Sequence, residues 1–302
     1  MTEPADPTSV TATEAGRVDK ELTRHFPDAG RQKIAELFDD GCVRVAGKRA
    51  KKGDRVNPGD VILLTRTPAS GAAMRPLPDP AVADQLVVLL EREELVVIYK
   101  PAGMPSQPLR AGELGTAANA IAHRWPECIT IGDDPREGGI THRLDIGTSG
   151  PLIVARTPET YRALRAAFGG KLVDKLYLAI TDGRPVSREC DAPLVQRGKK
   201  VVVDHTDGLA AFTSFTVDRA TETHALVRCE AQTGRMHQVR AHLAHVGSPI
   251  TGDPLYGGAP LPGIDGFFLH AASITFPLGT ERIRVEARAS DRFAAAIAAC
   301  GL

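Results

Sequence analysis

The sequence lacks several features that would assign it at once to a class of protein. Its 37 Lys and Arg residues are balanced by 37 Asp and Glu residues. The chain therefore lacks the net positive charge that would indicate a polyanionic partner. Nucleic-acid binding would therefore need local segregation of charge. No apolar run approaches the roughly 20 residues that cross a bilayer. The 302 residues suffice for about two globular domains.

Paired cysteines are also missing. The five cysteines are odd in number and scattered, and none forms a CxxC pair, so we expect reduced thiols in a cytoplasmic protein rather than a disulfide framework or zinc site: Cys42, Cys128, Cys190, Cys229 and Cys300. Residues 1–16 are acidic, rich in Pro and Thr, and without an apolar core. They predict a disordered tail, not a signal or transit peptide.

Residues 17–68 predict one compact unit. Helical spacing over 17–25 and 31–40 is followed by short strands with turns. Six cations, with Asp54 as the only acid among them, cluster in the strand region: Arg44, Lys48, Arg49, Lys51, Lys52 and Arg55. This cluster is either a solvated hairpin or a surface that binds phosphates.

A Pro- and Ala-rich linker is expected over 69–84, followed by a domain over 85–302. Within that domain strands are predicted at 86–90, 95–99, 151–155, 172–180, 225–231 and 282–288, and helices at 158–168, 236–246 and 291–300. The elements mix without regular βαβ alternation. The predicted fold class is α+β with a mostly antiparallel central sheet.

The most informative stretch is GITHRLDIGTSG, residues 139–150, which leads into an apolar strand. A carboxylate in a Gly-bearing loop beside a rigid strand is well placed for chemistry. On residue type alone, Asp145 could equally cap a turn and pair with Arg143 on the surface.

Several blocks, in order, resemble the pseudouridine synthases that act on large-subunit ribosomal RNA and on tRNA. HRLDxxTSG at 142–150 is similar to their catalytic signature. The similar blocks that accompany it are VIYKPAGMPSQP (97–108), KLYLAITDG (175–183), TGRMHQVRAHLAHVGSPITGDPLYG (233–257) and LHAASITFP (269–277). Residues 17–68 resemble the S-four-type RNA-binding domain that often precedes such catalytic domains.

The resemblance implies a role for each of four residues. Asp145 matches the catalytic carboxylate, and Arg240 the arginine that pairs with it in two-point fashion. Tyr177 matches the tyrosine that lies against the target base, although a strand aromatic is by itself more typical of a core. Arg143 matches a residue that fills the gap left by the extruded uridine.

Three further residues are weaker candidates for substrate binding. Lys100 and Arg235 are expected either to contact phosphate or to be surface cations. His142 is expected either to touch the substrate or to bond backbone groups and shape the loop. Residues 184–224 match the family least and are candidates for target-specific contacts.

The implied reaction moves the glycosidic bond of a uridine from N1 to C5. It involves no redox change and no second substrate, so no cofactor is expected. His237, His242 and His245 lie close in sequence, but no HExxH or Cys frame accompanies them, so no metal site is expected. The expected partner is RNA, with ribosomal RNA favoured and tRNA as the second candidate, and the expected state is a monomer.

Two other functions compete with this interpretation. The chain could be an RNA-binding or ribosome-assembly platform that has lost catalysis. A glycosidase would need two acids flanking the bond at roughly 5 to 9.5 Å. Asp133, Asp134 and Glu137 lie upstream of Asp145 but show no sign of that arrangement. Departures from the family pattern at Met236, Pro151, Ser106 and Gln107 affect the expected target rather than the reaction.

Overall fold

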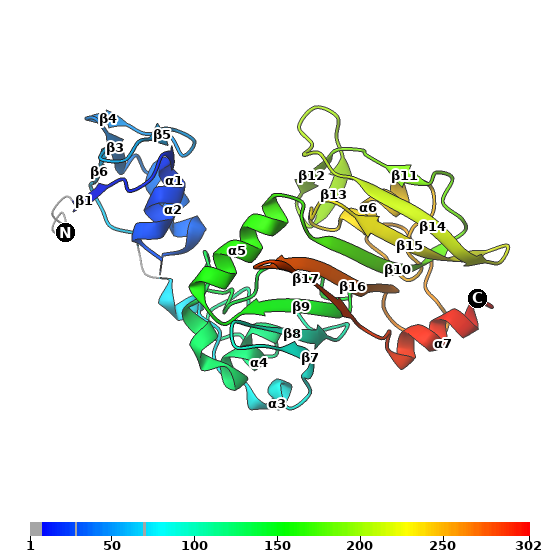
Figure 1. Cartoon of the computed structure of the whole chain (residues 1–302). Coiled ribbons are helices and arrows are strands. Elements are labelled where there is room, and N and C mark those ends of the chain that lie inside the picture. Colours follow the sequence, from blue (N-terminus) through cyan, green and yellow to red (C-terminus); the bar gives the residue numbers. More distant parts are fainter. Residues whose placement is uncertain (1–7, 28, 69–70) are drawn as a thin grey trace.

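The computed structural model describes residues 8–27, 29–68 and 71–302 and shows an N-terminal unit beside a larger C-terminal part (Figure 1). Every ladder between named strands in these ranges is antiparallel. Helices and strands mix without βαβ repeats. The predicted α+β class with a mostly antiparallel sheet is confirmed. None of the described helices is long and apolar enough to span a bilayer.

The N-terminal unit packs two helices against a four-stranded sheet of order β1-β6-β3-β4. Val18 and Leu22 of α1, and Ile34 and Leu37 of α2, lie at helical spacing and face one core. That core draws all its residues from positions 10–64. The elements are β1 (Thr8–Thr11), β2 (Gly16–Arg17), α1 (Val18–His25), α2 (Gly30–Asp39), β3 (Val43–Val45), β4 (Lys48–Arg49), β5 (Arg55–Val56) and β6 (Val61–Leu64).

The expected tail over residues 1–16 differs from the structure. Residues 1–7 lie outside the described part of the chain, but Thr8–Thr11 forms β1 and pairs with Val61–Leu64. The TSVTA stretch alternates polar and apolar residues, so Val10 and Ala12 face the core and are buried. Two apolar residues at period two were enough to add an edge strand.

The expected linker over 69–84 also proves partly structured. Ala72–Met74 forms the 3-10 helix η1, and Pro80–Ala83 forms α3. The Asp79 side chain accepts from the Ala81 N–H and caps α3, whose first residue is a proline. Ala83 is buried in the core of the C-terminal part. The second half of this segment therefore belongs to that core.

The C-terminal part contains a three-stranded sheet, β7-β8-β9, and a six-stranded sheet, β11-β14-β15-β10-β16-β17. A bridge between Ser149 and His270 joins the two sheets. The strands are β7 (Val87–Glu91), β8 (Leu95–Lys100), β9 (Gly150–Ala155), β10 (Asp174–Asp182), β11 (Glu189–Cys190), β14 (Thr213–Ala220), β15 (His224–Ala231), β16 (Leu269–Leu278) and β17 (Glu281–Glu286), with a separate hairpin of β12 (Leu194–Arg197) and β13 (Lys200–Val203).

Helices cover both faces of each sheet. Apolar residues of α4 and α5 form separate cores with β8 and β9, so these helices pack on opposite faces of the smaller sheet. In the same way α6 and α7 pack on opposite faces of the larger sheet. The helices are α4 (Ala117–Arg124), η2 (Pro126–Thr130), α5 (Pro158–Gly169), α6 (Gln238–His245) and α7 (Asp291–Ala299). Sequence reasoning missed α4, although Thr116 and Asn119 form its capping box.

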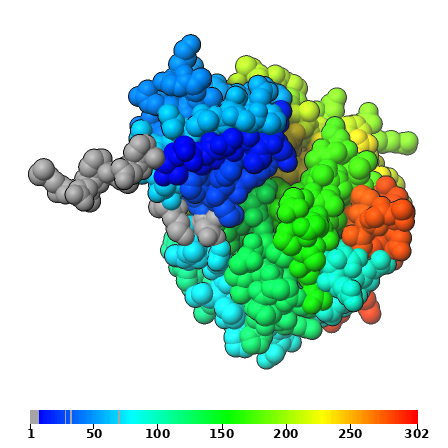
Figure 2. Space-filling view, turned by 60° about the vertical axis from the view of Figure 1, so that its left-hand side comes forward, coloured from blue at the N-terminus to red at the C-terminus, as the bar shows by residue number. Residues whose placement is uncertain are grey.

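The N-terminal unit contacts the C-terminal part through the start of α2. Arg31 pairs with Asp133 at 2.8 Å, and Gly30 lies against Pro135. Figure 2 shows the blue N-terminal residues lying against the green part of the chain. Because both members of the ion pair are about half exposed, this contact orients the unit but stabilises it little.

Candidate active site

Asp145 lies in the loop that enters β9, with its side chain 22% exposed. The hydroxyl of Ser106 binds both backbone groups of Leu144, the residue before Asp145. Ser106 Oγ donates to the Leu144 carbonyl at 2.9 Å and accepts from the Leu144 N–H at 3.2 Å. Both Ser106 and Leu144 are buried. The backbone that leads into Asp145 is therefore fixed by a side chain from the 97–108 segment.

Lys100 fixes the residue after Asp145. Its side chain is fully buried, and Nζ donates to the carbonyls of Pro101 at 3.0 Å, Met104 at 2.7 Å and Ile146 at 3.2 Å. Burial lowers the pKa of Lys100 to about 7, against the opposing charge of Asp145. All three donors of the ammonium are used inside the protein. The structure thus contradicts the expectation that Lys100 contacts substrate or lies on the surface.

Arg240 joins Asp145 to a second carboxylate. Its Nη1 donates to Asp145 Oδ2 at 3.0 Å, while Nε and Nη2 donate to the two oxygens of buried Asp253 at 2.7 and 3.0 Å. The guanidinium lies over the rings of Phe267, at 4.4 Å, and Tyr256, at 5.1 Å. Burial works against its charge, but Asp253 and Asp145 raise the pKa of Arg240 overall. The predicted pair between Arg240 and Asp145 is present, but it has one bond, and the two-point contact is made with Asp253 instead.

Tyr177 lies on β10, near enough to Asp145 to feel its charge. It packs between the core around α4 and the core around α6. Burial, with the charge of Asp145 second, raises the pKa of Tyr177, so its hydroxyl keeps its proton at neutral pH. That hydroxyl makes no hydrogen bond within the described part of the chain. A half-buried ring with an unused hydroxyl near a carboxylate can both stack on a base and exchange a proton.

The structure places the remaining predicted site residues, His142, Arg143 and Arg235, in different surroundings. His142 Nε2 accepts from the Ile153 N–H at 3.1 Å, and its ring packs on Phe168. Burial lowers the pKa of His142 to about 3, so the ring is neutral and shapes the loop, as one of the two expectations held. Arg143 is exposed and, among the described residues, has neither an ion pair nor a hydrogen bond. Arg235 is also exposed, and its Nε donates to the Ala210 carbonyl at 3.1 Å.

Three residues at the site were not singled out for it by sequence reasoning. Asp253 holds Arg240, Tyr256 packs against Arg240, and His237 Nε2 lies 3.9 Å from Asp145 Oδ1. All three fall inside the 233–257 block, and that block was the available signal. Its spacing could not show that the GDPLY turn folds back under α6.

The neighbouring histidines do not converge on a common point. His242 is buried, and its two ring nitrogens bond Thr213 Oγ1 and the Ala192 carbonyl, each at 2.9 Å. No cluster of three or more His, Cys, Asp or Glu side chains suited to a metal ion occurs among the described residues.

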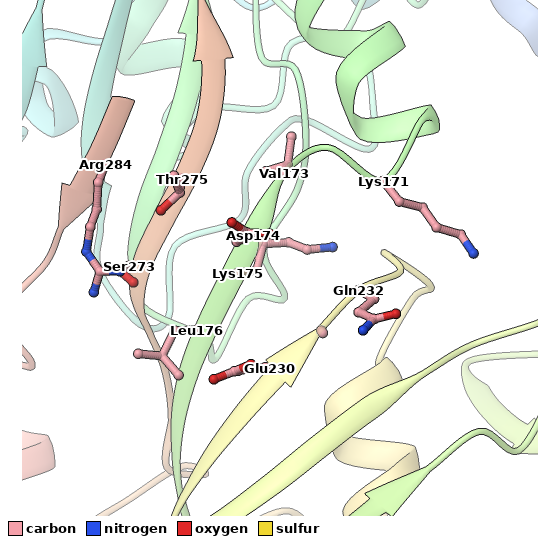
Figure 3. Close-up of a pocket in the computed structure, with 11 residues that line it drawn as sticks. Lys171, Val173, Asp174, Lys175, Leu176, Glu230, Gln232, Ser273, Thr275 and Arg284 are labelled. Carbon is pink, nitrogen blue, oxygen red and sulfur yellow. The ribbon is translucent and has the colours of Figure 1, made fainter. Parts of the chain in front are cut away.

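A pocket of about 440 Å³ opens at the start of β10, two residues before Tyr177 (Figure 3). Lys175 Nζ donates to the Thr233 carbonyl at 2.6 Å, which ties the pocket to the loop that carries Arg235. Burial lowers the pKa of Lys175 to about 8, against the opposing charge of Asp174. In Figure 3 the side chains of Lys171 and Lys175 extend toward the side where Gln232 lies. This side of the pocket therefore carries two lysines, of which Lys171 is exposed and Lys175 is half-buried.

Comparisons with known proteins identify the family of the chain. Residues 94–245 match the family model described as RNA pseudouridylate synthase. The chain is 34% identical over 294 residues to the protein named ribosomal large subunit pseudouridine synthase D of Xanthomonas campestris, covering 90% of this chain and 85% of that one. It is 35% identical over 248 residues to the protein of the same name from Pseudomonas aeruginosa, covering 80% and 74%.

A solved structure shares the fold. The human protein titled RNA pseudouridylate synthase domain containing 4 superposes with a TM-score of 0.61 at 22% identity, over 73% of this chain and 96% of that one. The fold and the family match together define an isomerase that acts on RNA. The chain belongs to the RNA pseudouridylate synthase family and is an RNA pseudouridine synthase.

Proposed function

We propose that this enzyme isomerises specific uridines of large-subunit ribosomal RNA, with Asp145 as the catalytic carboxylate. The names of the bacterial relatives favour ribosomal RNA, and tRNA remains the second candidate. The observation that carries the assignment of Asp145 is its partly exposed carboxylate, which pairs at 3.0 Å with Arg240.

The proposed chemistry begins with cleavage of the bond between ribose C1′ and uracil N1. Asp145 either attacks C1′ or removes a proton from the sugar, and in both cases it must be ionised and close to the ribose. Arg240 supplies a permanent positive charge against it. Since Asp253 holds the opposite edge of the guanidinium, Arg240 cannot swing away from Asp145.

The other site residues fit successive stages of the reaction. Exposed Arg143 is proposed to fill the gap that the extruded uridine leaves in the RNA. Tyr177 is proposed to stack on the uracil and to help the C5 proton leave. Arg235 and the lysines of the pocket beside β10 are proposed to contact the RNA backbone near the target. Lys100 and His142 then act on the loop, not on the substrate.

The test is release of tritium from RNA labelled at uracil C5, because that carbon loses its hydrogen when it becomes the new glycosidic link. The wild-type enzyme should release tritium, and Asp145→Asn should release none while keeping its unfolding midpoint and its affinity for RNA. The matched control is Asp218→Asn, which also breaks an Asp–Arg pair, with Arg228 at 2.8 Å, but on the exposed face of β14. Asp218→Asn should keep full activity.

Separate incubations with ribosomal RNA and with tRNA test the substrate. Release from ribosomal RNA alone supports the proposed target, and release from tRNA alone replaces it. A fully active Asp145→Asn protein would reject the assignment of the carboxylate whichever RNA is used.

The N-terminal unit is proposed to be an S-four-type RNA-binding domain spanning about residues 17–68, extended by β1. Its separate core and its exposed cations support this assignment. We further propose that the enzyme works as a monomer in the cytoplasm. Light scattering on the purified protein, with and without RNA, tests the oligomeric state.

A further inference from the structure

His237 has an unusual backbone conformation at the edge of the site. Its φ is 52°, in the left-handed region that few residues other than glycine adopt, and it lies directly before α6. Strained backbone of this kind persists only where the surroundings enforce it, and it clusters at functional sites. Here the ring lies edge-on to Tyr256, with centroids 5.8 Å apart, and Nδ1 lies 3.1 Å from the Tyr256 hydroxyl.

The Tyr256 hydroxyl decides which ring nitrogen carries the proton. It accepts from the Val201 N–H at 3.0 Å, and its own proton can go to the Val201 carbonyl at 3.2 Å or to His237 Nδ1. The other ring nitrogen, Nε2, lies 3.9 Å from Asp145 Oδ1. A lone pair on Nε2 would face that carboxylate, so the favoured tautomer carries its proton on Nε2, and the unprotonated Nδ1 accepts from the Tyr256 O–H.

This Nε2–H donor is left without an acceptor. A distance of 3.9 Å is too long for a hydrogen bond to Asp145, and no other acceptor lies within bonding distance in the described part of the chain. Burial lowers the pKa of His237, with Asp145 opposing this and Arg240 adding to it, so the ring is neutral near pH 7. Its side chain is 16% exposed. A fixed, neutral donor therefore faces the space beside the carboxylate.

We propose that His237 is a substrate-binding residue whose Nε2–H donates a hydrogen bond to an oxygen of the target uridine next to C1′. That oxygen is uracil O2 or the ribose 2′-oxygen, both of which come close to any group that reaches the sugar. O2 gains negative charge when the C1′–N1 bond breaks, so a donor there stabilises the departing base. Tyr256 is then a positioning residue for His237. This proposal rests on the role proposed for Asp145.

Two substitutions at His237 separate substrate binding from a structural role. In His237→Gln the amide N–H reaches the place of Nε2. In His237→Asn the amide stays near the place of Nδ1, keeps the contact with Tyr256 and tolerates the left-handed backbone, but leaves the Nε2 position empty. We expect kcat to fall roughly 100-fold in His237→Asn, which is the loss typical of removing one transition-state hydrogen-bond donor. In His237→Gln we expect kcat to fall much less. An Asn variant as active as the Gln variant, or more so, overturns the proposal.

Tyr256→Phe provides a second measurement, since it keeps the ring that packs on Arg240 and removes only the hydroxyl. We expect kcat to fall with little change in KM, because the donor loses its orientation while RNA binding remains. A Tyr256→Phe enzyme with wild-type kcat contradicts the positioning role.

Substrate analogues identify the oxygen. RNA that carries 2-thiouridine or 2′-deoxyuridine at the modified position is compared in the wild type and in His237→Asn. The analogue that removes the true acceptor should slow the wild type and have little further effect on the variant. Equal penalties in both proteins for both analogues exclude a bond from His237. If Asp145→Asn is inactive and the His237 variants behave alike, only this inference fails; an active Asp145→Asn enzyme rejects the proposed site itself.

Discussion

Arg240 is shared between two carboxylates that differ in exposure. Asp253 is fully buried and takes two bonds of the guanidinium, whereas Asp145 takes one and is 22% exposed. One arginine against two acids leaves the cluster with one net negative charge. Since Asp253 has no access to solvent, the accessible part of that charge lies on Asp145. The arrangement keeps the Asp145 carboxylate both paired and open on one side.

Ser106 carries a residue-scale prediction. Ser106→Ala removes both bonds to Leu144 and leaves a buried N–H unsatisfied, which costs about 1 to 3 kcal/mol. Because Leu144 directly precedes Asp145, the substitution should misalign the carboxylate. We expect kcat to fall about tenfold for each 1.4 kcal/mol of transition-state stabilisation that is lost, with KM nearly unchanged. Single-turnover tritium release measures the effect.

Ser248→Ala is the control for Ser106→Ala. Ser248 is equally buried, but its hydroxyl has no hydrogen-bond partner among the described residues. Its removal should leave kcat unchanged. Equal losses in the two variants would mean that the backbone bonds of Ser106 do not position Asp145.

At the scale of elements, the loop with Asp145 is fixed where β9 meets β16. Gly150, the last residue of the TSG motif, has a φ of +132° and begins β9. A Cβ at this position would run into the carbonyl and the side chain of Ala271. The glycine is therefore needed for close approach of the two sheets as well as for its backbone angle.

Gly150→Ala should lower the free energy of unfolding by about 3 kcal/mol, because the strand must shift away from Ala271. Activity should fall with it, since the loop with Asp145 ends at this residue. Gly169→Ala is the contrast: it lies in α5 with no atom near the added Cβ, so it should be neutral or stabilise by up to about 1 kcal/mol. Urea titrations in which both variants match the wild type would contradict this account.

At the scale of the whole molecule, buried histidines make stability depend on pH. Burial lowers the pKa of four of them, namely His142, His237, His242 and His270. In the unfolded chain each takes up a proton near pH 6.5. Between the folded and unfolded pKa values the unfolded state binds more protons, so the free energy of unfolding falls as the pH drops below about 6.5.

His142 tests this dependence, because its folded pKa of about 3 gives the widest window. In His142→Gln the amide oxygen can still accept from the Ile153 N–H, but the group does not titrate. Between pH 6.5 and 4 we expect the slope of unfolding free energy against pH to decrease by about one proton, or about 1.4 kcal/mol per pH unit. Urea titrations across this range measure it, and an unchanged slope would show that His142 is charged in the folded protein.

The basic hairpin of the N-terminal unit supplies a second whole-molecule prediction. Lys48, Lys51 and Lys52 are exposed, whereas Arg49 donates to the carbonyls of Phe38 and Asp39 at the end of α2. Replacing the three lysines by Gln should weaken RNA binding and reduce the salt slope by about 2, at roughly 0.7 per phosphate contact. Filter binding at several salt concentrations measures both.

Arg49→Gln serves as the comparison for the three lysines. It should lower the free energy of unfolding, because the Arg49 guanidinium caps the end of α2. It should change the salt slope less than the triple lysine variant does. An unchanged affinity and salt slope in the triple lysine variant would leave the hairpin as a solvated turn.

Much of the fold could be predicted because strongly patterned segments form the same elements wherever they pack. The strands at 95–99 and 151–155 and the helix at 158–168 were expected within two residues of their observed ends. The strands of segment 184–224 were not predicted. Three of them, β11, β12 and β13, have at most four residues and depend on tertiary contacts, whereas β14 has eight residues and was simply missed. Within it, β13 is held by Tyr256, which lies 55 residues further along the chain than Val201.

The sequence by itself determined the reaction class and the pairing of Asp145 with Arg240, because the motif blocks are long and ordered. Only the tertiary structure decided that Lys100 is buried, that Asp253 holds Arg240, and that His237 presents an unused donor. These contacts join segments far apart in the chain, and they depend on which polar groups lose water when the sheets and helices pack. The spacing of residues along the sequence cannot predict which of these groups lose water.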